Sequence, residues 1–84
     1  MTSILLVEDS ASLAQGLKSN LEFEGYEVVV AATARDALAA LSGEAHDGVA
    51  FDLVVLDLML PDGDGYRVLR ALRESGDGTP VLIL

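Results

Sequence analysis

The sequence predicts an α/β domain in which helices cover both faces of a parallel β-sheet. Short, continuous apolar runs are typical of strands that are buried on both faces. These runs alternate with segments whose leucines recur at helical spacing, which favours a parallel sheet. The 84 residues are enough for one small domain. The predicted order is strand 3–7, helix 10–24, strand 26–31, helix 33–43, strand 52–56, helix 65–74 and strand 81–84.

The first helix has residues suited to its two ends and to one apolar face. Ser10 is a candidate N-cap because its hydroxyl can accept a hydrogen bond from a free backbone N–H. Gly25 fits the position just past the helix end, where a left-handed backbone is common. The apolar stripe of this helix consists of Leu13, Ala14, Leu17 and Leu21.

The later elements have comparable signals. Thr33 with Asp36 resembles a capping box at the start of the second helix. The polar, glycine-bearing segment 43–51 connects that helix to the third strand. Asp64 is predicted to cap the third helix, and Pro80 leads into the last strand.

Composition excludes several functional classes. The net charge is -9, with 14 acidic against 5 basic residues, so binding of nucleic acid or of an anionic membrane through this segment is not expected. The chain has no cysteine and hence neither a disulfide framework nor a thiolate metal site. It has no apolar run of membrane-spanning length and no basic start typical of a signal peptide. We expect a cytoplasmic protein.

Acidic residues follow two of the predicted strands. Glu8 and Asp9 come directly after the first strand, and Asp57 comes directly after the third. If these strands are neighbours, the carboxylates meet at the edge of the sheet where α/β proteins bind ligands. Crowded carboxylates repel one another unless a cation lies between them, and Mg²⁺ prefers oxygen ligands. A carboxylate can also attack phosphorus. The pattern suggests Mg²⁺-assisted phosphoryl transfer onto an aspartate, whereas Glu8 and Asp9 alone could be a solvated strand end.

Three stretches carry a family resemblance: "LLVEDS" (5–10), "VVLDLMLPDGDGYRVLRALR" (54–73) and "TPVLIL" (79–84). Over its whole length the chain resembles the CheY-like receiver domain of two-component response regulators. The resemblance implies a flavodoxin-like, doubly wound parallel sheet with five strands in the order 2-1-3-4-5. Residues 1–84 would form the N-terminal two-thirds of that domain. They would hold the order 2-1-3-4, with the usual fifth strand and last two helices missing.

The resemblance also implies roles for individual residues. Asp57 matches the phosphoacceptor. Asp9 matches the acid that binds Mg²⁺ directly, and Glu8 matches the acid that usually acts through a metal-bound water. Met59 matches the position whose backbone carbonyl completes the protein ligands of the metal. Gly65 matches the loop that turns the chain into the third helix.

The family pattern extends beyond Leu84. It places a Ser or Thr after the fourth strand, an aromatic residue within the fifth strand and a Lys after it. None of these positions falls within the 84 residues. Apolar edge strands tend to pair with other chains. We therefore expect self-association, or complementation by another chain, through the exposed strand 81–84.

The expected function is that of a signalling module. Asp57 would take a phosphoryl group from a partner histidine kinase, and an output outside this chain, often transcription, would be regulated. The module would not be an enzyme beyond supporting its own phosphoryl transfer. One alternative is a protein-interaction module that works without phosphorylation. Another is a phosphatase of the haloacid dehalogenase type, which needs a second Asp two residues after the nucleophile, where this sequence has Met59.

Overall fold

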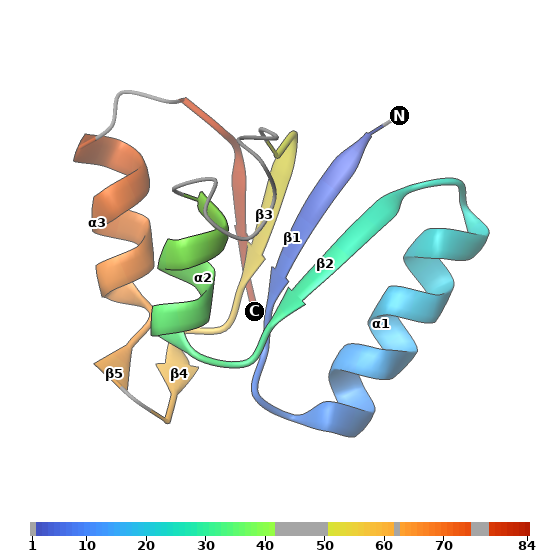
Figure 1. Cartoon of the computed structure of the whole chain (residues 1–84), viewed down its shortest axis with the longest axis horizontal. Helices are drawn as coiled ribbons and strands as arrows, with labels where there is room; N and C mark the ends of the chain where they lie inside the picture. The colour runs from blue at the N-terminus through green and yellow to red at the C-terminus, as the bar shows by residue number, and fades with distance from the viewer. Residues whose placement is uncertain (1, 42–50, 62, 75–77) are drawn as a thin grey trace.

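The fold was analysed in a computed structural model that describes residues 2–41, 51–61, 63–74 and 78–84. In chain order the elements are β1 (Ser3–Val7), α1 (Ala11–Phe23), β2 (Glu27–Ala31), α2 (Ala34–Leu41), β3 (Leu53–Leu56), β4 (Met59–Leu60), β5 (Gly63–Asp64), α3 (Tyr66–Glu74) and β6 (Val81–Ile83). Figure 1 shows the helices on either side of a central sheet. The connection predicted at 43–51 lies largely outside the described residues.

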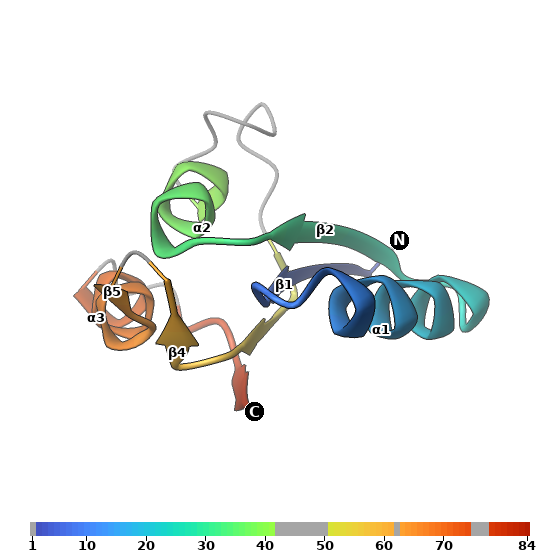
Figure 2. The same cartoon turned by 90° about the horizontal axis from the view of Figure 1, so that it is seen from below.

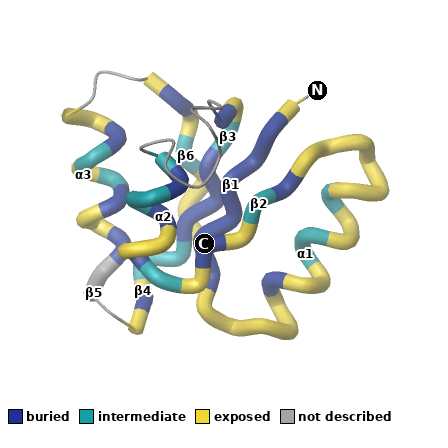
Figure 3. Tube along the Cα trace, viewed as in Figure 1, coloured by how far each residue is buried: buried dark blue, intermediate teal, exposed yellow. Residues whose placement is uncertain are grey.

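The central sheet is parallel and has the strand order β2-β1-β3-β6. This confirms the predicted order 2-1-3-4, since β6 is the strand predicted at 81–84. β1 lies in the middle and pairs with β2 on one side and β3 on the other. All five of its residues are buried, as a strand covered on both faces requires, and Figure 3 shows this central burial beside the largely exposed α1.

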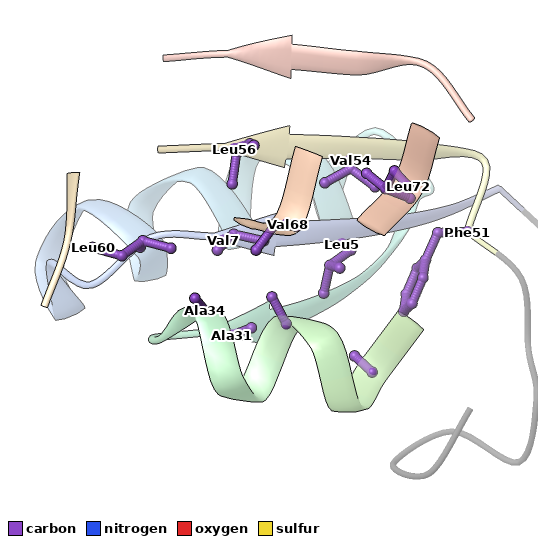
Figure 4. Close-up of a cluster of buried hydrophobic side chains, with 12 residues drawn as sticks. Leu5, Val7, Ala31, Ala34, Phe51, Val54, Leu56, Leu60, Val68 and Leu72 are labelled. Atoms are coloured by element: carbon purple, nitrogen blue, oxygen red, sulfur yellow. The ribbon is translucent and has the colours of Figure 1, made fainter. Parts of the chain in front are cut away.

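The two faces of the sheet carry separate apolar cores. On one face α1 packs over alternate strand residues, and Figure 2 shows α1 apart from α2 and α3. On the other face α2 and α3 cover the remaining strand residues. The first core consists of Ile4, Leu6, Ala14, Val28 and Val55, with Leu17, Leu21 and Leu53 packed against it. The second consists of Leu5, Val7, Ala31, Ala34, Ala37, Ala40, Phe51, Val54, Leu56, Leu60, Val68 and Leu72 (Figure 4).

The predicted ends of α1 are confirmed. Ser10 Oγ accepts a 3.4 Å hydrogen bond from the N–H of Leu13. Beyond the helix, Gly25 has φ +95°, and its N–H donates to the carbonyl of Glu22 at 3.0 Å. Together with the bond from Tyr26 N–H to the carbonyl of Leu21, this is a Schellman motif.

The predicted apolar stripe of α1 is partly wrong. Ala14 is buried and Leu17 and Leu21 pack against the sheet, but Leu13 is half-exposed. Residue 13 lies at the margin of the helix face that Ala14, Leu17 and Leu21 turn towards the sheet, because spacing by four residues drifts slowly around a helix.

The cap predicted at the second helix is confirmed. Thr33 Oγ1 accepts a 3.0 Å hydrogen bond from the N–H of Asp36, and the helix begins at Ala34. At its other end, α2 is described to Leu41, two residues short of the predicted limit.

The segment after β3 differs from the prediction. Met59–Leu60 pairs with Gly63–Asp64 as a two-stranded antiparallel sheet, where a simple turn and a cap at Asp64 were predicted. The third helix begins at Tyr66, and the carbonyl of Gly65 accepts hydrogen bonds from Val68 and Leu69. The helix thus begins one residue later than predicted, and Gly65 rather than Asp64 holds the position just before it.

The last strand is tied to the sheet and to α3. The N–H of Val54 donates to the carbonyl of Pro80 at 3.0 Å, and that of Leu84 donates to the carbonyl of Leu56 at 2.9 Å. Arg73 Nη1 donates to the carbonyl of Thr79 at 3.4 Å. No helix in the described parts of the chain is both long enough and apolar enough to cross a membrane.

Candidate functional site

The candidate site lies at the carboxyl ends of β1 and β3. The N–H of Asp57 donates to the carbonyl of Val7 at 2.9 Å, and the N–H of Glu8 donates to the carbonyl of Ala31 at 3.0 Å. These bonds continue the sheet's pairing by one residue past the strands. They fix where each acidic residue leaves the sheet, and this is the edge at which parallel α/β sheets place their sites.

Three predicted site residues meet at this edge. One carboxylate oxygen from each of Glu8, Asp9 and Asp57 lies within 4.8 Å of the corresponding oxygens of the other two. Glu8 is buried, Asp57 is partly buried and Asp9 is exposed. The grouping therefore reaches from the interior to the surface and leaves a route from solvent to the carboxylate of Asp57.

Backbone N–H groups orient two of the carboxylates. Glu8 Oε1 accepts a 3.0 Å hydrogen bond from the N–H of Ser10. Asp57 Oδ1 accepts a 2.9 Å hydrogen bond from the N–H of Met59. Each donor lies two residues after its acceptor, so the turn that follows the strand holds the side chain in place.

The acidic grouping is electrostatically costly without a cation. Burial raises the pKa of the Glu8 carboxyl above its usual range. The hydrogen bond from Ser10 opposes this rise, whereas the charge of Asp57 and the contact with Asp9 add to it. Glu8 is only 4% exposed, so water stabilises its charge poorly. A group that supplies positive charge would relieve both the burial penalty and the repulsion.

The donor set suits a small, hard divalent cation. Carboxylate oxygens are the ligands that Mg²⁺ and Ca²⁺ prefer, and Mg²⁺ typically takes one or two carboxylates and keeps several waters. The three carboxylates could hold such an ion, with water or phosphate oxygens completing its coordination. Cysteine is absent from the sequence, so soft-metal thiolate chemistry has no ligand here.

Met59 is predicted to act through its backbone carbonyl, whereas the three acids act through their side chains. Its N–H contacts Asp57, and its side chain is 82% exposed. The sequence favours a packing role for the Met59 side chain over a ligand role, and the exposure shows that the side chain does not pack in the interior. A ligand role for its backbone carbonyl remains a prediction.

Sequence reasoning missed part of what shapes the site. The N–H of Gly65 donates to the carbonyl of Leu58 at 2.8 Å, and a Cβ atom placed on Gly65 would meet the backbone of Asp57 and Leu58. The resemblance places this glycine in the loop before the third helix and implies no contact with β3. No local signal distinguishes it from Gly63, two residues earlier, because the contact depends on how the chain folds back onto the end of β3.

The comparisons with known proteins agree with this geometry. A family model for the response regulator receiver domain matches residues 4–84. The transcriptional regulatory protein TrcR of Mycobacterium tuberculosis is 43% identical over 96% of this chain, which covers 30% of TrcR. The chain spans about a third of the length of the curated relatives it matches.

Solved structures show the same fold. The non-phosphorylated HemR receiver domain of Leptospira biflexa aligns with a TM-score of 0.83 and 37% identity, over 99% of this chain and 63% of that one. The response regulator TrrA of Thermotoga maritima, in complex with Mg²⁺-BeF, aligns with a TM-score of 0.78 and 30% identity, over 99% of this chain and 66% of that one. The chain belongs to the response regulator receiver domain family.

Proposed function

We propose that Asp57 is the phosphoacceptor of a two-component signalling system and that a histidine kinase is its donor. The observation that carries this proposal is the meeting of Glu8, Asp9 and Asp57 at the carboxyl edge of the sheet. A partly buried carboxylate with solvent access can act as a nucleophile towards phosphorus. Family membership and the likeness to TrrA, a protein solved with Mg²⁺-BeF, support the assignment.

The phosphoryl transfer is a displacement at phosphorus. One carboxylate oxygen of Asp57 attacks the phosphorus of a phosphohistidine and forms an acyl phosphate. The P–N bond to the kinase breaks, and its electron pair returns to the imidazole nitrogen. The N–H of Met59 holds Oδ1 of Asp57, so the orientation of the nucleophile is set before the donor arrives.

Glu8 and Asp9 serve this reaction as the other ligands of a divalent cation, with Asp9 on the exposed side and Glu8 on the buried side. When bound, Mg²⁺ supplies positive charge that offsets the negative charge of the transferring phosphoryl group. The backbone carbonyl of Met59 is the further protein ligand that we assign by resemblance. The phosphorylation state of Asp57 would regulate an output outside these 84 residues, and the names of relatives such as TrcR point to transcription.

The test is acyl-phosphate formation with a small phosphodonor and Mg²⁺. We expect a phosphoryl mass increment on the wild type and none on Asp57→Asn. Asp52→Asn is the matched control, since Asp52 directly precedes β3 and Asp57 directly follows it. Labelling that survives in Asp57→Asn would overturn the assignment of the acceptor. Turnover of a phosphomonoester would favour a phosphatase, and no labelling of the wild type would favour a module that works without phosphorylation.

We also propose that a second copy of this chain associates through β6. Leu82, Ile83 and Leu84 are each about half exposed, although all three are apolar. β6 lies at the edge of the central sheet and pairs with β3 on one side. Exposed apolar edges tend to add a further strand.

A further inference from the structure

We infer that Gly65 is a positioning residue for the phosphoacceptor, an inference that rests on the function proposed for Asp57. A Cβ atom placed on Gly65 would lie 2.7 Å from the backbone oxygen of Asp57 and 2.8 Å from the Cα of Leu58. It would also lie 3.2 Å from Cδ1 of Leu56. Two of these contacts are shorter than 3.0 Å, closer than Cβ atoms in proteins approach other heavy atoms, and both involve backbone.

Position 65 requires a glycine because there is no room for a Cβ atom, and not because of its backbone conformation. The φ angle of Gly65 lies outside the left-handed region, so an L-residue could adopt its backbone. Gly25 is the opposite case: its φ is +95° and nothing lies within 4 Å of a Cβ built on it. Gly65 is therefore required because a side chain has no room there, whereas Gly25 is required because its backbone is left-handed.

The atoms that would be displaced are those that hold Asp57. The peptide unit formed by the carbonyl of Asp57 and the N–H of Leu58 leads directly to Met59, whose N–H orients Asp57 Oδ1. The N–H of Gly65 also donates to the carbonyl of Leu58 at 2.8 Å. Gly65 thus lies against the backbone on both sides of Leu58. It therefore helps to fix the backbone between Asp57 and the N–H of Met59, which orients the Asp57 carboxylate.

The end of β3 leaves little room for relaxation. The N–H of Asp57 is bonded to the carbonyl of Val7, and the carbonyl of Leu56 accepts from Leu84. Leu56 is fully buried, so its side chain cannot turn into solvent. An added methyl group would have to move the segment from Asp57 to Met59 or push Gly65 away from it. Either shift would separate groups whose placement decides cation binding and attack on phosphorus.

Three glycine-to-alanine substitutions test this inference. Gly65→Ala is expected to weaken Mg²⁺ binding about 10- to 100-fold, as loss of outer-shell support for metal ligands typically does. Gly25→Ala is the matched control for destabilisation: its backbone would be strained, but it lies at the far end of α1 from Ser10. Gly16→Ala is the control for the methyl group itself, since nothing lies within 4 Å of its added Cβ.

The readouts are Mg²⁺ affinity by calorimetry and melting temperature without metal, measured for the wild type and all three variants. We expect Gly25→Ala to lower the melting temperature while keeping the wild-type affinity. Gly16→Ala should also keep that affinity and should raise the melting temperature. Only Gly65→Ala should lose affinity. Unchanged affinity in Gly65→Ala, or an equal loss in Gly25→Ala, would overturn the inference.

If Gly65→Ala does not fold, a measurement on the wild type still tests the inference. In an ¹⁵N-labelled sample titrated with Mg²⁺, the amide signals of Gly65 and Met59 should move together, whereas those of Gly16 and Gly25 should stay in place. A Gly65 signal that does not follow that of Met59 would contradict the inference. If the wild type neither binds Mg²⁺ nor is phosphorylated, the proposed function fails instead, so the two failures are distinguishable.

Discussion

The backbone N–H of Met59 donates a 2.9 Å hydrogen bond to Oδ1 of Asp57, while the Met59 side chain is 82% exposed. The backbone of Met59 therefore contacts the site, whereas its side chain is exposed to solvent. The backbone orients the carboxylate that we propose as the phosphoacceptor. The side chain contributes little to the fold, because most of its surface is in contact with water.

This division predicts opposite outcomes for two substitutions at the same position. Met59→Ala keeps the N–H and should change the free energy of unfolding by less than about 0.5 kcal/mol, as for most surface positions. Met59→Pro removes the N–H and should weaken Mg²⁺ binding about tenfold, because Asp57 loses its orienting donor. Denaturant unfolding checks the stability of Met59→Ala. Calorimetric titration with Mg²⁺ checks the affinity of both variants, which should be that of the wild type in Met59→Ala. An equal loss of affinity in the two variants would show that the side chain matters instead.

Glu8→Gln is predicted to stabilise the metal-free protein at neutral pH. The raised pKa of Glu8 means that the folded state binds this proton more tightly than the unfolded state does. Below the unfolded-state pKa both states are protonated and the penalty vanishes. As the pH rises through the ordinary glutamate range towards the raised folded value, the unfolded state ionises first, and the wild type loses stability.

Thermal unfolding of wild type and Glu8→Gln from about pH 4 to 8, spanning the usual carboxyl range, measures this difference. The two curves should coincide at low pH and separate as the pH rises, with the variant above. Added Mg²⁺ should narrow or reverse the difference in stability between the two proteins, since the wild type keeps the Glu8 carboxylate as a metal ligand. Glu22→Gln makes the same charge change at an exposed position of α1 and is the control for the loss of a surface charge. Parallel curves at all pH values would contradict the argument.

Asp52 is predicted to support the fold without affecting the site. Its Oδ2 accepts a 2.8 Å hydrogen bond from the N–H of Ser3, and its own N–H donates to the carbonyl of Ser3 at 2.8 Å. This reciprocal pair joins β1 and β3 at the end of the sheet opposite Asp57. Asp52→Ala should cost about 1 kcal/mol of unfolding free energy, the usual net value of one hydrogen bond.

Denaturant unfolding of the Asp52 variants, together with Mg²⁺ titration, checks this prediction. Asp52→Asn keeps an oxygen acceptor and should lose less stability than Asp52→Ala. Both should bind Mg²⁺ as the wild type does. A loss of Mg²⁺ affinity in either variant would show that strand pairing at one end of the sheet is transmitted to the other.

The parts of the fold that the sequence predicted correctly depend on local chemistry or on strong periodicity. Ser10, Gly25 and Thr33 act where they were expected, because a cap needs only a side chain or a φ angle and its neighbours within one helical turn. The meeting of Glu8, Asp9 and Asp57 required one further assumption, that β1 and β3 are neighbours, and the strand pairing confirms it.

The missed features depend on contacts that no short stretch of sequence specifies. β4 and β5 are two residues each, too short for the alternation by which strands are recognised. The steric role of Gly65 depends on Leu56, Asp57 and Leu58, which approach it only once the chain has turned back onto β3.

The chain is predicted to self-associate through β6. The apolar side chains of Leu82 and Ile83 point to opposite faces of the strand, and both are exposed. Burial of such surface against a second copy is favourable at about 25 cal/mol per Å² of apolar area. Light scattering of the 84-residue chain at micromolar concentration should therefore show a species larger than the monomer, in an amount that rises with concentration.

Leu82→Lys should weaken this association at least about tenfold, or ~1.4 kcal/mol, because a lysine on the edge strand must lose its hydration when another strand pairs there. Val30→Lys places the same charge on β2, the opposite edge of the sheet, at a residue that is also exposed. It should leave the association constant unchanged. A monomer at every concentration would refute the proposal, and weakening by Val30→Lys alone would move the contact to the β2 edge.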